Sequence, residues 1–475
     1  MSTELRNFLA LSYEELEELN LQAKTDRMNR VAIDEIREKR LKYLTDQKNI
    51  KAVTVLFSDL EGRLHLLDYD KKFLLGASEN LTFDGSSIRG FTAQKESDLR
   101  LGIDWSAFYW VPADVFGNGK VLVFGNVIDK DGSPYGADMR GVLKTYSEKL
   151  FKEKQYTLNA ATEIEGFLFA GKDAEQRYHE TNKFEFVNTG GYFHSLPLDP
   201  LRQFIDTAAE VQRAMGFQNE KDHPEVAPSQ FEINYGYAEV VAAADQIQLY
   251  KLLCRQIATN MGYTASFLPK PVVGVNGSGM HTNVSVSQGK TNLFWEEKGV
   301  EQLSKFGWDF LDRILTHALD LCLIFNSSVN AYRRLDPHFE APNQIRASAV
   351  DRGAMVRVPI GNHRSMRTEV RAVAPDANPY LALYGIFKTG VDGQISTDNL
   401  RSGGKYLPDN IQQAIDDFSH SAWIGQILGT DVQGRYVDLK QAVANRSPRD
   451  LGAIVKGSEV QFHHAVYNQS LWSLF

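Results

Sequence analysis

The stretch Arg367-Thr368-Glu369-Val370-Arg371 alternates charged residues with Thr and Val, a period of two that is typical of a β-strand. Two other stretches alternate in the same way, Glu163-Ile164-Glu165 and His281-Thr282-Asn283-Val284-Ser285. Residues two apart stand on the same side of a strand, about 7 Å from each other, so each stretch gathers its ionisable groups on one face. We expect these faces to line a polar cavity and the interleaved Ile and Val residues to face a core. Such a cavity would suit cations and phosphates together, which favours a metal- and nucleotide-dependent enzyme.

The bulk composition narrows the class of protein. A chain of 475 residues is too long for one ordinary core, so two domains are expected, and 43% hydrophobic with 24% charged residues is typical of a soluble globular protein. The net charge of −8 argues against general binding to nucleic acid or to anionic membranes. Only Cys254 and Cys322 are present, both in apolar segments, which predicts buried thiols rather than disulfides. With no signal-peptide pattern and no apolar run long enough to span a bilayer, we expect a cytoplasmic protein.

The periodicity changes along the chain and predicts three parts. Residues 13–47 lack Gly and Pro and carry apolar residues near helical spacing, which predicts one or two amphipathic helices. From Lys51 the period becomes two, with a turn at Glu61-Gly62, which indicates a β-hairpin. The segment 129–136 is dense in turn-forming residues and is the best linker. We therefore predict a helical N-terminal extension (1–48), a small β-rich domain (49–134) and a larger domain (135–475).

In the larger domain, helices alternate with strands. Helices are expected over 141–153, 201–215, 242–261 and 302–326, and over most of the tail from residue 409. Strands are expected over 157–169, in two pieces flanking a loop over 272–286, and in two pieces over 354–373.

Acidic residues form the first candidate site. Glu225 and Glu232 join Glu163 and Glu165, and an isolated Glu would normally be a solvated surface residue. Here Glu165 lies in an apolar segment, and a buried carboxylate needs a counter-charge, for which a metal is suitable. Oxygen ligands with the single imidazole of His281 favour Mg²⁺ or Mn²⁺ over zinc or copper.

A glycine-rich loop and an arginine cluster supply the second and third candidate sites. The loop Asn276-Gly-Ser-Gly-Met-His281 can bring backbone N–H groups close to phosphate, although such loops are often plain turns, and it lacks the Gly-Lys-Ser/Thr of a P-loop. One region without lysine holds Arg333, Arg334, Arg346, Arg352, Arg357, Arg364, Arg367 and Arg371. Arginine is preferred for bidentate contacts to carboxylate or phosphate, so we interpret the region as an anion pocket; a basic partner-binding patch is the alternative.

These motifs together resemble those of the glutamine synthetase family, type I. The matching motifs occur in family order: Phe83-Asp-Gly-Ser-Ser-Ile-Arg-Gly-Phe91, Glu163-Ile-Glu165, the Glu225/Glu232 run, Asn276-Gly-Ser-Gly-Met-His281 and the stretch from Arg367 to Leu383. The resemblance runs from about Val53 to Gly393. It implies an α+β fold, with a β-grasp-like N-terminal domain and a catalytic domain whose curved antiparallel sheet is flanked by helices.

The resemblance also implies a reaction and its metal ions. ATP would phosphorylate the γ-carboxylate of L-glutamate, and ammonia would then displace phosphate from γ-glutamyl phosphate to give glutamine. Two or more Mg²⁺ or Mn²⁺ ions would assist. One ion would be held by Glu165, Glu225 and Glu232. A second would be held by Glu163, His281 and Glu369.

Further residues receive roles from the same resemblance. Arg334 and Arg371 would hold the glutamate α-carboxylate, with Gly277 approaching the substrate. Arg352 and Arg357 would contact the transferred phosphate. The nucleotide would be contacted by Glu220, Ser285, Arg352 and Arg367.

The ammonium site is the part of the pattern that best distinguishes members of the family. It would be formed by Asp84, Ser87, Tyr192, Glu225 and Glu340, with Glu340 taking a proton. In the family, residues at the positions of Asp84 and Asp98 enter the neighbouring subunit's site. The resemblance therefore implies a homo-oligomer, a dodecamer of two hexameric rings, with glutamate, ammonium and ATP as ligands and no nucleic-acid or membrane partner.

The chain departs from the family pattern at several positions. His223-Pro224-Glu225 replaces the usual His-His-Glu, Asn283 replaces a common His, and Asp351 precedes Arg352 where Asn is common. The region 396–406 lacks the loop on which some bacterial members are adenylylated, so we predict no such regulation. The adjacent His463 and His464 are interpreted as part of a packed helix.

Two other functions stay open. A γ-glutamyl-amide ligase would use an organic amine in place of ammonia, and the retained Asp84, Ser87 and Tyr192 argue against it. A non-catalytic structural relative would have lost metal or arginine residues, and none is lost here.

Overall fold

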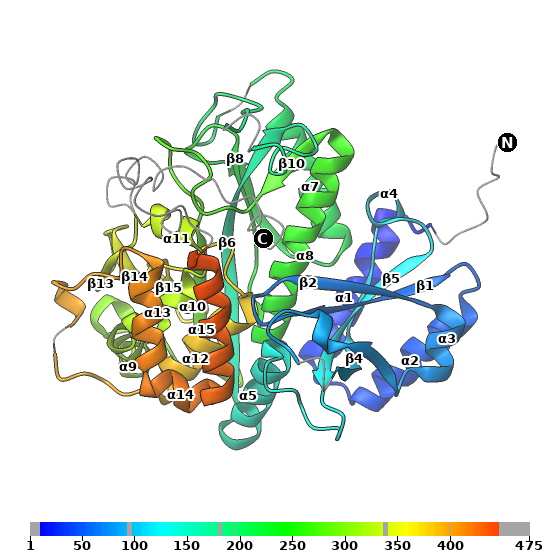
Figure 1. The fold of residues 1–475 in the computed structure, drawn as a ribbon, viewed down its shortest axis with the longest axis horizontal. Helices are drawn as coiled ribbons and strands as arrows, with labels where there is room; N and C mark the ends of the chain where they lie inside the picture. Colours follow the sequence, from blue (N-terminus) through cyan, green and yellow to red (C-terminus); the bar gives the residue numbers. More distant parts are fainter. Residues whose placement is uncertain are drawn as a thin grey trace.

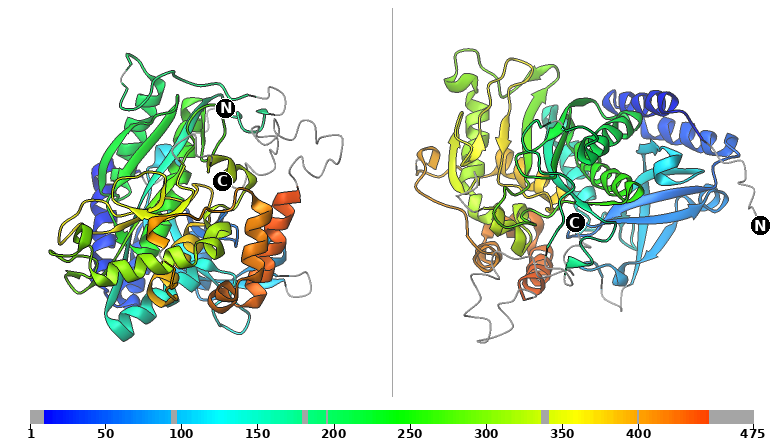
Figure 2. Two further views of the ribbon diagram at one scale, coloured as in Figure 1. Left: turned by 90° about the vertical axis from the view of Figure 1, so that its left-hand side faces the viewer. Right: turned by 90° about the horizontal axis from the view of Figure 1, so that it is seen from above.

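The N-terminal part begins with two helices, as the apolar spacing predicts. The computed structural model describes residues 10–92, 97–178, 183–194, 196–335, 341–398 and 400–445. Helix α1 (Tyr13–Met28) begins at a capping box in which Ser12 and Glu15 exchange hydrogen bonds, and α2 (Ile33–Asp46) follows. Both helices pack on strand β4 (Asp98–Trp110), and α1 also contacts α7 (Pro200–Ala214) of the larger domain (Figure 2). The extension therefore bridges the two sheets of the molecule.

Five strands form the first sheet, in the order β2-β1-β5-β4-β3. Its other members are β1 (Ala52–Ser58), β2 (Leu64–Asp70), β3 (Leu81–Asp84) and β5 (Lys120–Ile128), with short helices α3 (Lys71–Ala77) and α4 (Ala113–Phe116) between them. Strands β1 and β2 form the predicted antiparallel hairpin, and β1 pairs with β5 in parallel. Gly62 closes the hairpin with a positive φ of 91°, a conformation that glycine adopts without strain.

A second, larger sheet carries the order β13-β14-β15-β11-β6-β8-β7. These strands are β6 (Tyr156–Ala170), β7 (Asn219–Pro224), β8 (Gln230–Tyr235), β11 (Met280–Gln288), β13 (Gln344–Ser348), β14 (Ala354–Arg357) and β15 (Thr368–Val370). The short strands β9 (Ala238–Glu239) and β10 (Tyr263–Ser266) pair with β6, and β12 (Thr291–Asn292) pairs with β11. The sheet is antiparallel except between β13 and β14.

Helices flank this sheet, and β6 runs beside the long helix α8 (Figure 1). Besides α7 they are α5 (Met139–Lys154), α8 (Val240–Met261), α9 (Lys305–Thr316), α10 (Ala318–Phe325), α11 (Val329–Arg334), α12 (Pro379–Asp392), α13 (Ile411–His420), α14 (Ala422–Leu428) and α15 (Thr430–Asn445). The predicted α+β architecture is confirmed. Among the helices of the described segments, none is both long and apolar enough to cross a membrane.

Two predicted elements are wrong. The single helix expected over 302–326 is two helices, because Ser304 caps α9 and His317 takes a non-helical conformation (φ −101°, ψ 20°) with its ring stacked on Trp423. The strand expected to open the segment 272–286 is a loop that follows Pro269 and Pro271, residues that cannot donate hydrogen bonds to a sheet. The strand lies earlier, as β10.

A buried network of charges joins the N-terminal sheet to helices of the larger domain. Arg140 on α5 forms two hydrogen bonds of 2.8 Å to Asp245 on α8 and one of 3.1 Å to Asp104 on β4. Lys144 contacts the same Asp104 carboxylate at 2.9 Å, and the Tyr380 hydroxyl donates to Asp245 at 2.8 Å. Since Asp104 belongs to the N-terminal sheet and the others to the larger domain, these bonds hold the two together.

Candidate active site

The three alternating stretches of the sequence lie on adjacent strands of the larger sheet. In the β6–β11 register, His281 faces Glu163, and in the β11–β15 register Asn283 faces Glu369. The interleaved Ile164 and Val370 are fully buried in the core. The predicted alternation is therefore confirmed, and it brings the charged residues of distant segments to one cavity.

Glu163, His281 and Glu369 form the first group of candidate metal ligands. One ligand atom from each lies within 4.8 Å of the others, and His281 Nδ1 is 3.9 Å from a carboxylate oxygen of each glutamate. Burial opposes ionisation of Glu163, but His281, Lys221 and Asn283 together outweigh it and lower the pKa of this carboxyl to about 2. Burial, assisted by the positive charge of Arg371, lowers the pKa of His281, which keeps the imidazole neutral and able to bind a metal.

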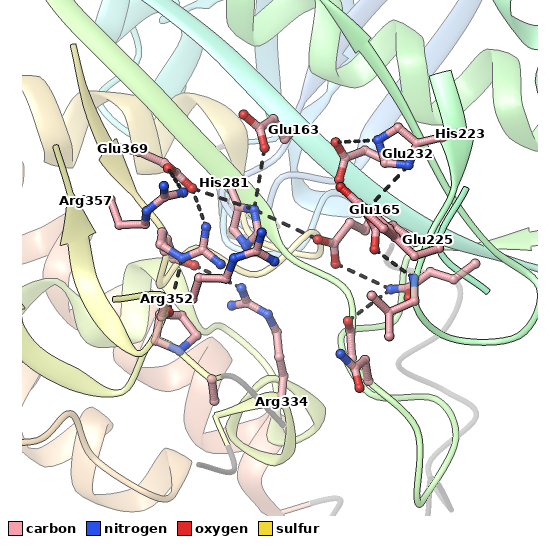
Figure 3. Close-up of a pocket in the computed structure, with 18 of the residues that line it drawn as sticks. Glu163, Glu165, His223, Glu225, Glu232, His281, Arg334, Arg352, Arg357 and Glu369 are labelled. Atoms are coloured by element: carbon pink, nitrogen blue, oxygen red, sulfur yellow. Dashed lines mark hydrogen bonds and ion pairs between the residues drawn. The ribbon is translucent and has the colours of Figure 1, made fainter. Parts of the chain in front are cut away.

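His223, Glu225 and Glu232 form the second group, again with one ligand atom each within 4.8 Å. Strand pairing sets His223 opposite Glu232 on one side and Glu165 opposite Glu232 on the other. Burial and then repulsion from Glu163 and Glu225 raise the pKa of Glu232 to about 8. Burial and the carboxylates of Glu232 and Glu225 likewise raise the pKa of Glu165, which lies between the two groups (Figure 3).

His223 is the member of this group that the sequence analysis did not select. In the sequence it stands out only as part of a departure from the family pattern. The signal was present, because His223 stands two residues before Glu225 and two such residues point the same way on an extended chain. Lys221 and Gln230 also line the cavity without having been selected.

Arginines face the first group across the cavity. Glu369 accepts a hydrogen bond of 2.9 Å from Arg357 and one of 2.5 Å from Arg371. Arg334 is buried and donates to the Arg371 carbonyl oxygen at 2.9 Å. Burial lowers the pKa of Arg334 to about 10, which still leaves the guanidinium charged at neutral pH. The cavity thus offers positive charge beside negative charge, the combination that a phosphorylated or carboxylated ligand with cations requires.

The glycine-rich loop leaves no room for side chains. A Cβ at Gly277 would lie 2.5 Å from the Pro269 carbonyl oxygen, and one at Gly279 would lie 2.6 Å from Arg334 Nη2 and 2.8 Å from His281 Nε2. The Gly279 N–H donates to Glu165 at 2.8 Å. The loop therefore lets the backbone approach the site closely.

Two neighbouring cavities share three lining residues, Glu163, Lys221 and Arg367. The first, which we call the acidic cavity, has a volume of about 270 Å³, and Figure 3 shows its arginines. Its other predicted lining residues are Glu165, Tyr192, Glu225, Glu232, Gly277, His281, Arg334, Arg352, Arg357, Glu369 and Arg371. The second, the adjoining cavity, has a volume of about 870 Å³, and its lining includes Glu220 and Ser285.

Two predicted site residues that the structure describes do not line either cavity. Asp84 and Ser87 are exposed on the N-terminal domain, where Ser87 donates a hydrogen bond of 2.5 Å to Asp84, and neither lines the two cavities. Glu340 lies outside the described residues, as do His463 and His464. Tyr192 is exposed at the acidic cavity, with its ring 5.5 Å from that of His223.

Protein-family models of glutamine synthetases match nearly the whole chain. Residues 49–130 match the glutamine synthetase beta-Grasp domain, and residues 136–450 match the glutamine synthetase catalytic domain. Glutamine synthetases of Methanosarcina mazei and Thermus thermophilus are each 34% identical, over 83% of this chain and 91% and 92% of theirs. That of Thermotoga maritima is 31% identical over 89% of this chain and 98% of its own.

Solved structures share the fold. A Plasmodium falciparum glutamine synthetase superposes with a TM-score of 0.77 at 21% identity, covering 88% of this chain and 98% of that one. A chain described as a GmaS/ADP complex superposes with a TM-score of 0.75 at 22% identity, covering 89% and 99%. The protein belongs to the glutamine synthetase family. It is accordingly an ATP-dependent ligase.

Proposed function

We propose that the protein joins ammonia to the γ-carboxylate of L-glutamate, with ATP as co-substrate, and releases glutamine, ADP and phosphate. The observation that carries the proposal is the acidic cavity, in which two groups of ligands and four buried or half-buried arginines converge beside a second cavity. Curated relatives that match over most of their length bear the same activity in their names.

The donor set fits divalent cations, and Mg²⁺ or Mn²⁺ is proposed. Each group offers carboxylate oxygens with one imidazole, and a cation would offset the burial and the carboxylate repulsion that raise the pKa of Glu232. Glu163, His281 and Glu369 would hold one ion, and Glu225 and Glu232, with Glu165 between the groups, would hold another. Bound cations would neutralise charge on the phosphates of the nucleotide.

The chain's own residues would place and activate the substrates. Arg334 and Arg371 would hold the α-carboxylate of glutamate near the Gly277 backbone, so that its γ-carboxylate attacks the γ-phosphorus of ATP and ADP leaves. Arg352 and Arg357 would stabilise charge on the transferred phosphoryl group.

The nucleotide would occupy the adjoining cavity, which is the larger of the two. Support comes from the lining residues Glu220, Ser285 and Arg367, which fall where the family resemblance places nucleotide contacts. Because the two cavities share Glu163 and Arg367, the phosphate end of the nucleotide would reach the acidic cavity.

Ammonium would be collected beside Glu225 and Tyr192, and Glu340 would take its proton before ammonia attacks the acyl carbon and phosphate leaves. Asp84 and Ser87 would complete this site from the neighbouring subunit. Their exposure on the N-terminal domain, away from the chain's own cavity, supports that arrangement. We therefore propose a homo-oligomer, a dodecamer of two hexameric rings. The buried free thiols Cys254 and Cys322 are consistent with a reducing cytoplasm, which is part of the proposal.

Phosphate release from ATP tests the proposal. Purified protein is given glutamate and Mg²⁺ with either ammonium or a panel of primary amines, and the product is identified by mass. Release that requires ammonium and yields glutamine supports the proposal, and Glu340→Ala should abolish most of it. Release only with an amine would establish a γ-glutamyl-amide ligase instead. No release with any acceptor, from intact oligomers, would refute both.

A further inference from the structure

Asn330 joins helix α11 to the loop between β10 and β11, residues 267–279. It is only 4% exposed, and it exchanges two hydrogen bonds with the backbone of one loop residue, Lys270. Lys270 N donates to Asn330 Oδ1 at 2.6 Å, and Asn330 Nδ2 donates to the Lys270 carbonyl oxygen at 2.9 Å. Because both polar atoms of the side chain bond to the same residue, Asn330 fixes where the loop begins.

The other end of this loop rests on its beginning. Ser278 N donates to the carbonyl oxygen of Pro269, the residue before Lys270, at 2.7 Å. A Cβ on Gly277 would lie 2.5 Å from the same carbonyl oxygen and 3.1 Å from Arg334 Cγ. The Gly277 backbone is therefore confined between the start of the loop and Arg334, and a shift of the loop start would carry it along.

Helix α11 carries Arg334 four residues after Asn330, so the two residues lie on one face of the helix. Arg334 is held in turn by its bond to the Arg371 carbonyl oxygen. Both Arg334 and Gly277 line the acidic cavity, whereas Asn330 lines neither cavity. Asn330 thus ties together two parts of the cavity wall without facing the cavity itself.

We propose that Asn330 is a positioning residue for the amino-acid substrate, because it sets the separation between the Arg334 guanidinium and the Gly277 backbone. These two groups would hold the α-carboxylate end of glutamate, so the inference rests on the proposed function. The α end does not react, and its contacts are therefore the same in the ground state and the transition state. Loss of such contacts raises KM and leaves kcat unchanged.

Phosphate release by the full-length variant Asn330→Leu tests the inference. Leucine has a similar branched shape but can form neither bond. We expect KM for glutamate to rise about tenfold, the effect of one misaligned hydrogen bond to a charged group. The kcat and the KM for ATP should stay within about twofold of the parent. Where Asn330→Leu does not assemble, Asn330→Asp replaces it, since a carboxylate keeps the bond from Lys270 N and opposes the Lys270 carbonyl oxygen.

Asn20 provides a matched control. It is also 4% exposed, and it exchanges the same two bonds with the backbone of Trp110, at 3.1 Å to Oδ1 and 2.8 Å from Nδ2. Asn20 lines neither cavity. Asn20→Leu should therefore lose a similar amount of stability in urea unfolding and leave the KM for glutamate unchanged. An equal rise of this KM in both variants would overturn the inference, because general destabilisation would then explain it.

Hydrogen exchange over residues 268–279 adds a measurement without turnover. The amides of Lys270 and Ser278 should exchange faster in Asn330→Leu than in the parent, and Asn20→Leu should not change them. Unchanged exchange, or an unchanged KM for glutamate in a variant of an active parent, would overturn the inference and leave the proposed function intact. A parent that releases no phosphate with glutamate, and binds none in calorimetric titration of the ADP-loaded protein, would overturn the proposed function and this inference with it.

Discussion

At the scale of single residues, Gly279 is constrained by two side chains of the site. A Cβ there would meet Arg334 Nη2 at 2.6 Å and His281 Nε2 at 2.8 Å, so Gly279→Ala must displace both side chains. A displacement of about 1 Å in a catalytic constellation costs about 10²-fold in rate. We expect kcat/KM for glutamate to fall by about that factor while the protein still assembles, as measured by phosphate release and particle mass.

The control for this variant is Gly434→Ala on helix α15. Apart from its chain neighbours and the backbone of its own helix, no heavy atom of the described residues lies within 4 Å of a Cβ at Gly434. Alanine is favoured over glycine inside a helix by about 0.5–1 kcal/mol. Gly434→Ala should therefore leave activity unchanged and raise the free energy of unfolding slightly. Equal activity in both variants would contradict the crowding described for Gly279.

Glu369 should matter for stability as well as for activity. Its carboxylate pairs with Arg357 and Arg371 while almost fully buried, and breaking a buried pair leaves an uncompensated charge that costs about 3–5 kcal/mol. We expect Glu369→Gln to lower the free energy of unfolding by about that amount and to abolish most phosphate release. Asp398→Asn breaks an exposed 3.0 Å pair with Lys405 and should cost at most about 1 kcal/mol. Urea unfolding measures the loss of stability in both variants. An equal loss in the two would show that burial of the carboxylate does not matter.

How far the site could be predicted depended on the local pattern around each residue. Glu163, His281 and Glu369 could be predicted because each sits in a strand between a threonine and an apolar residue, so period two reveals a charged face. His223 carries only the weaker signal of standing two residues before Glu225, because Pro224 and the loop after Glu225 break the alternation that would mark a strand face. His223 lies opposite Glu232 because β7 pairs with β8, and the local sequence does not reveal this pairing.

At the scale of elements, helix α12 depends on Asn378. The Asn378 side chain accepts hydrogen bonds from Tyr380 N and Leu381 N, which caps the helix, and its amide donates to the carbonyl oxygens of Asp59 (3.3 Å) and Leu60 (3.1 Å) in the N-terminal domain. One side chain thus starts a helix and joins two domains.

Two substitutions separate these roles. Asn378→Asp keeps the cap but sets a carboxylate against two carbonyl oxygens, and Asn378→Ala removes both functions. A buried group that is unsatisfied or repelled costs about 1–3 kcal/mol, and a lost helix cap costs about 1 kcal/mol. We therefore expect Asn378→Asp to be at least as destabilising as Asn378→Ala. Thermal unfolding ranks the stabilities of the two variants and the parent. If Asn378→Asp were as stable as the parent, the amide contacts to Asp59 and Leu60 would contribute nothing.

Elements could be predicted where the chain's own periodicity decides them. The strand β6 and the helices α5, α7 and α8 follow from apolar spacing, and the structure has them within a few residues. The break at His317 could not be predicted, because the ring that stacks on it belongs to Trp423, more than a hundred residues away. The parts that sequence reasoning missed are those that a distant contact decides.

At the scale of the whole molecule, Asp104 links stability to pH. Burial alone would raise the pKa of this carboxyl, but Arg140 and Lys144 outweigh burial and hold it well below 3.8. A depressed pKa contributes stability that is complete above the unfolded value of 3.8 and is lost as the pH falls below it.

Asp104→Asn should therefore cost about 3–5 kcal/mol near neutral pH, and the gap to the parent should narrow as the pH falls below about 4. Unfolding midpoints measured across that range test the expectation. A gap that stays constant with pH would show that the carboxylate is not the group that titrates.

The assembly itself can be tested by mixing two variants in one particle. Asp84→Asn should impair the neighbour's site, and Glu163→Gln should impair the chain's own. A co-expressed equal mixture should recover about a quarter of the parent's activity, because one site in four would join an intact catalytic domain to an intact neighbouring Asp84. Phosphate release by particles of verified mixed composition measures the recovery.

Two controls make that experiment decisive for the shared site. Assemblies of the two variants that are purified separately and then mixed should stay inactive, since no intact pairing forms between closed rings. Asp131→Asn removes an exposed carboxylate that accepts hydrogen bonds from Ser133 in the same way as Asp84 does from Ser86, and it should leave activity unchanged. Absence of recovery in mixed particles would mean that Asp84 does not act across the subunit boundary. The exposed position of Asp84 would then need another explanation than a site built from two chains.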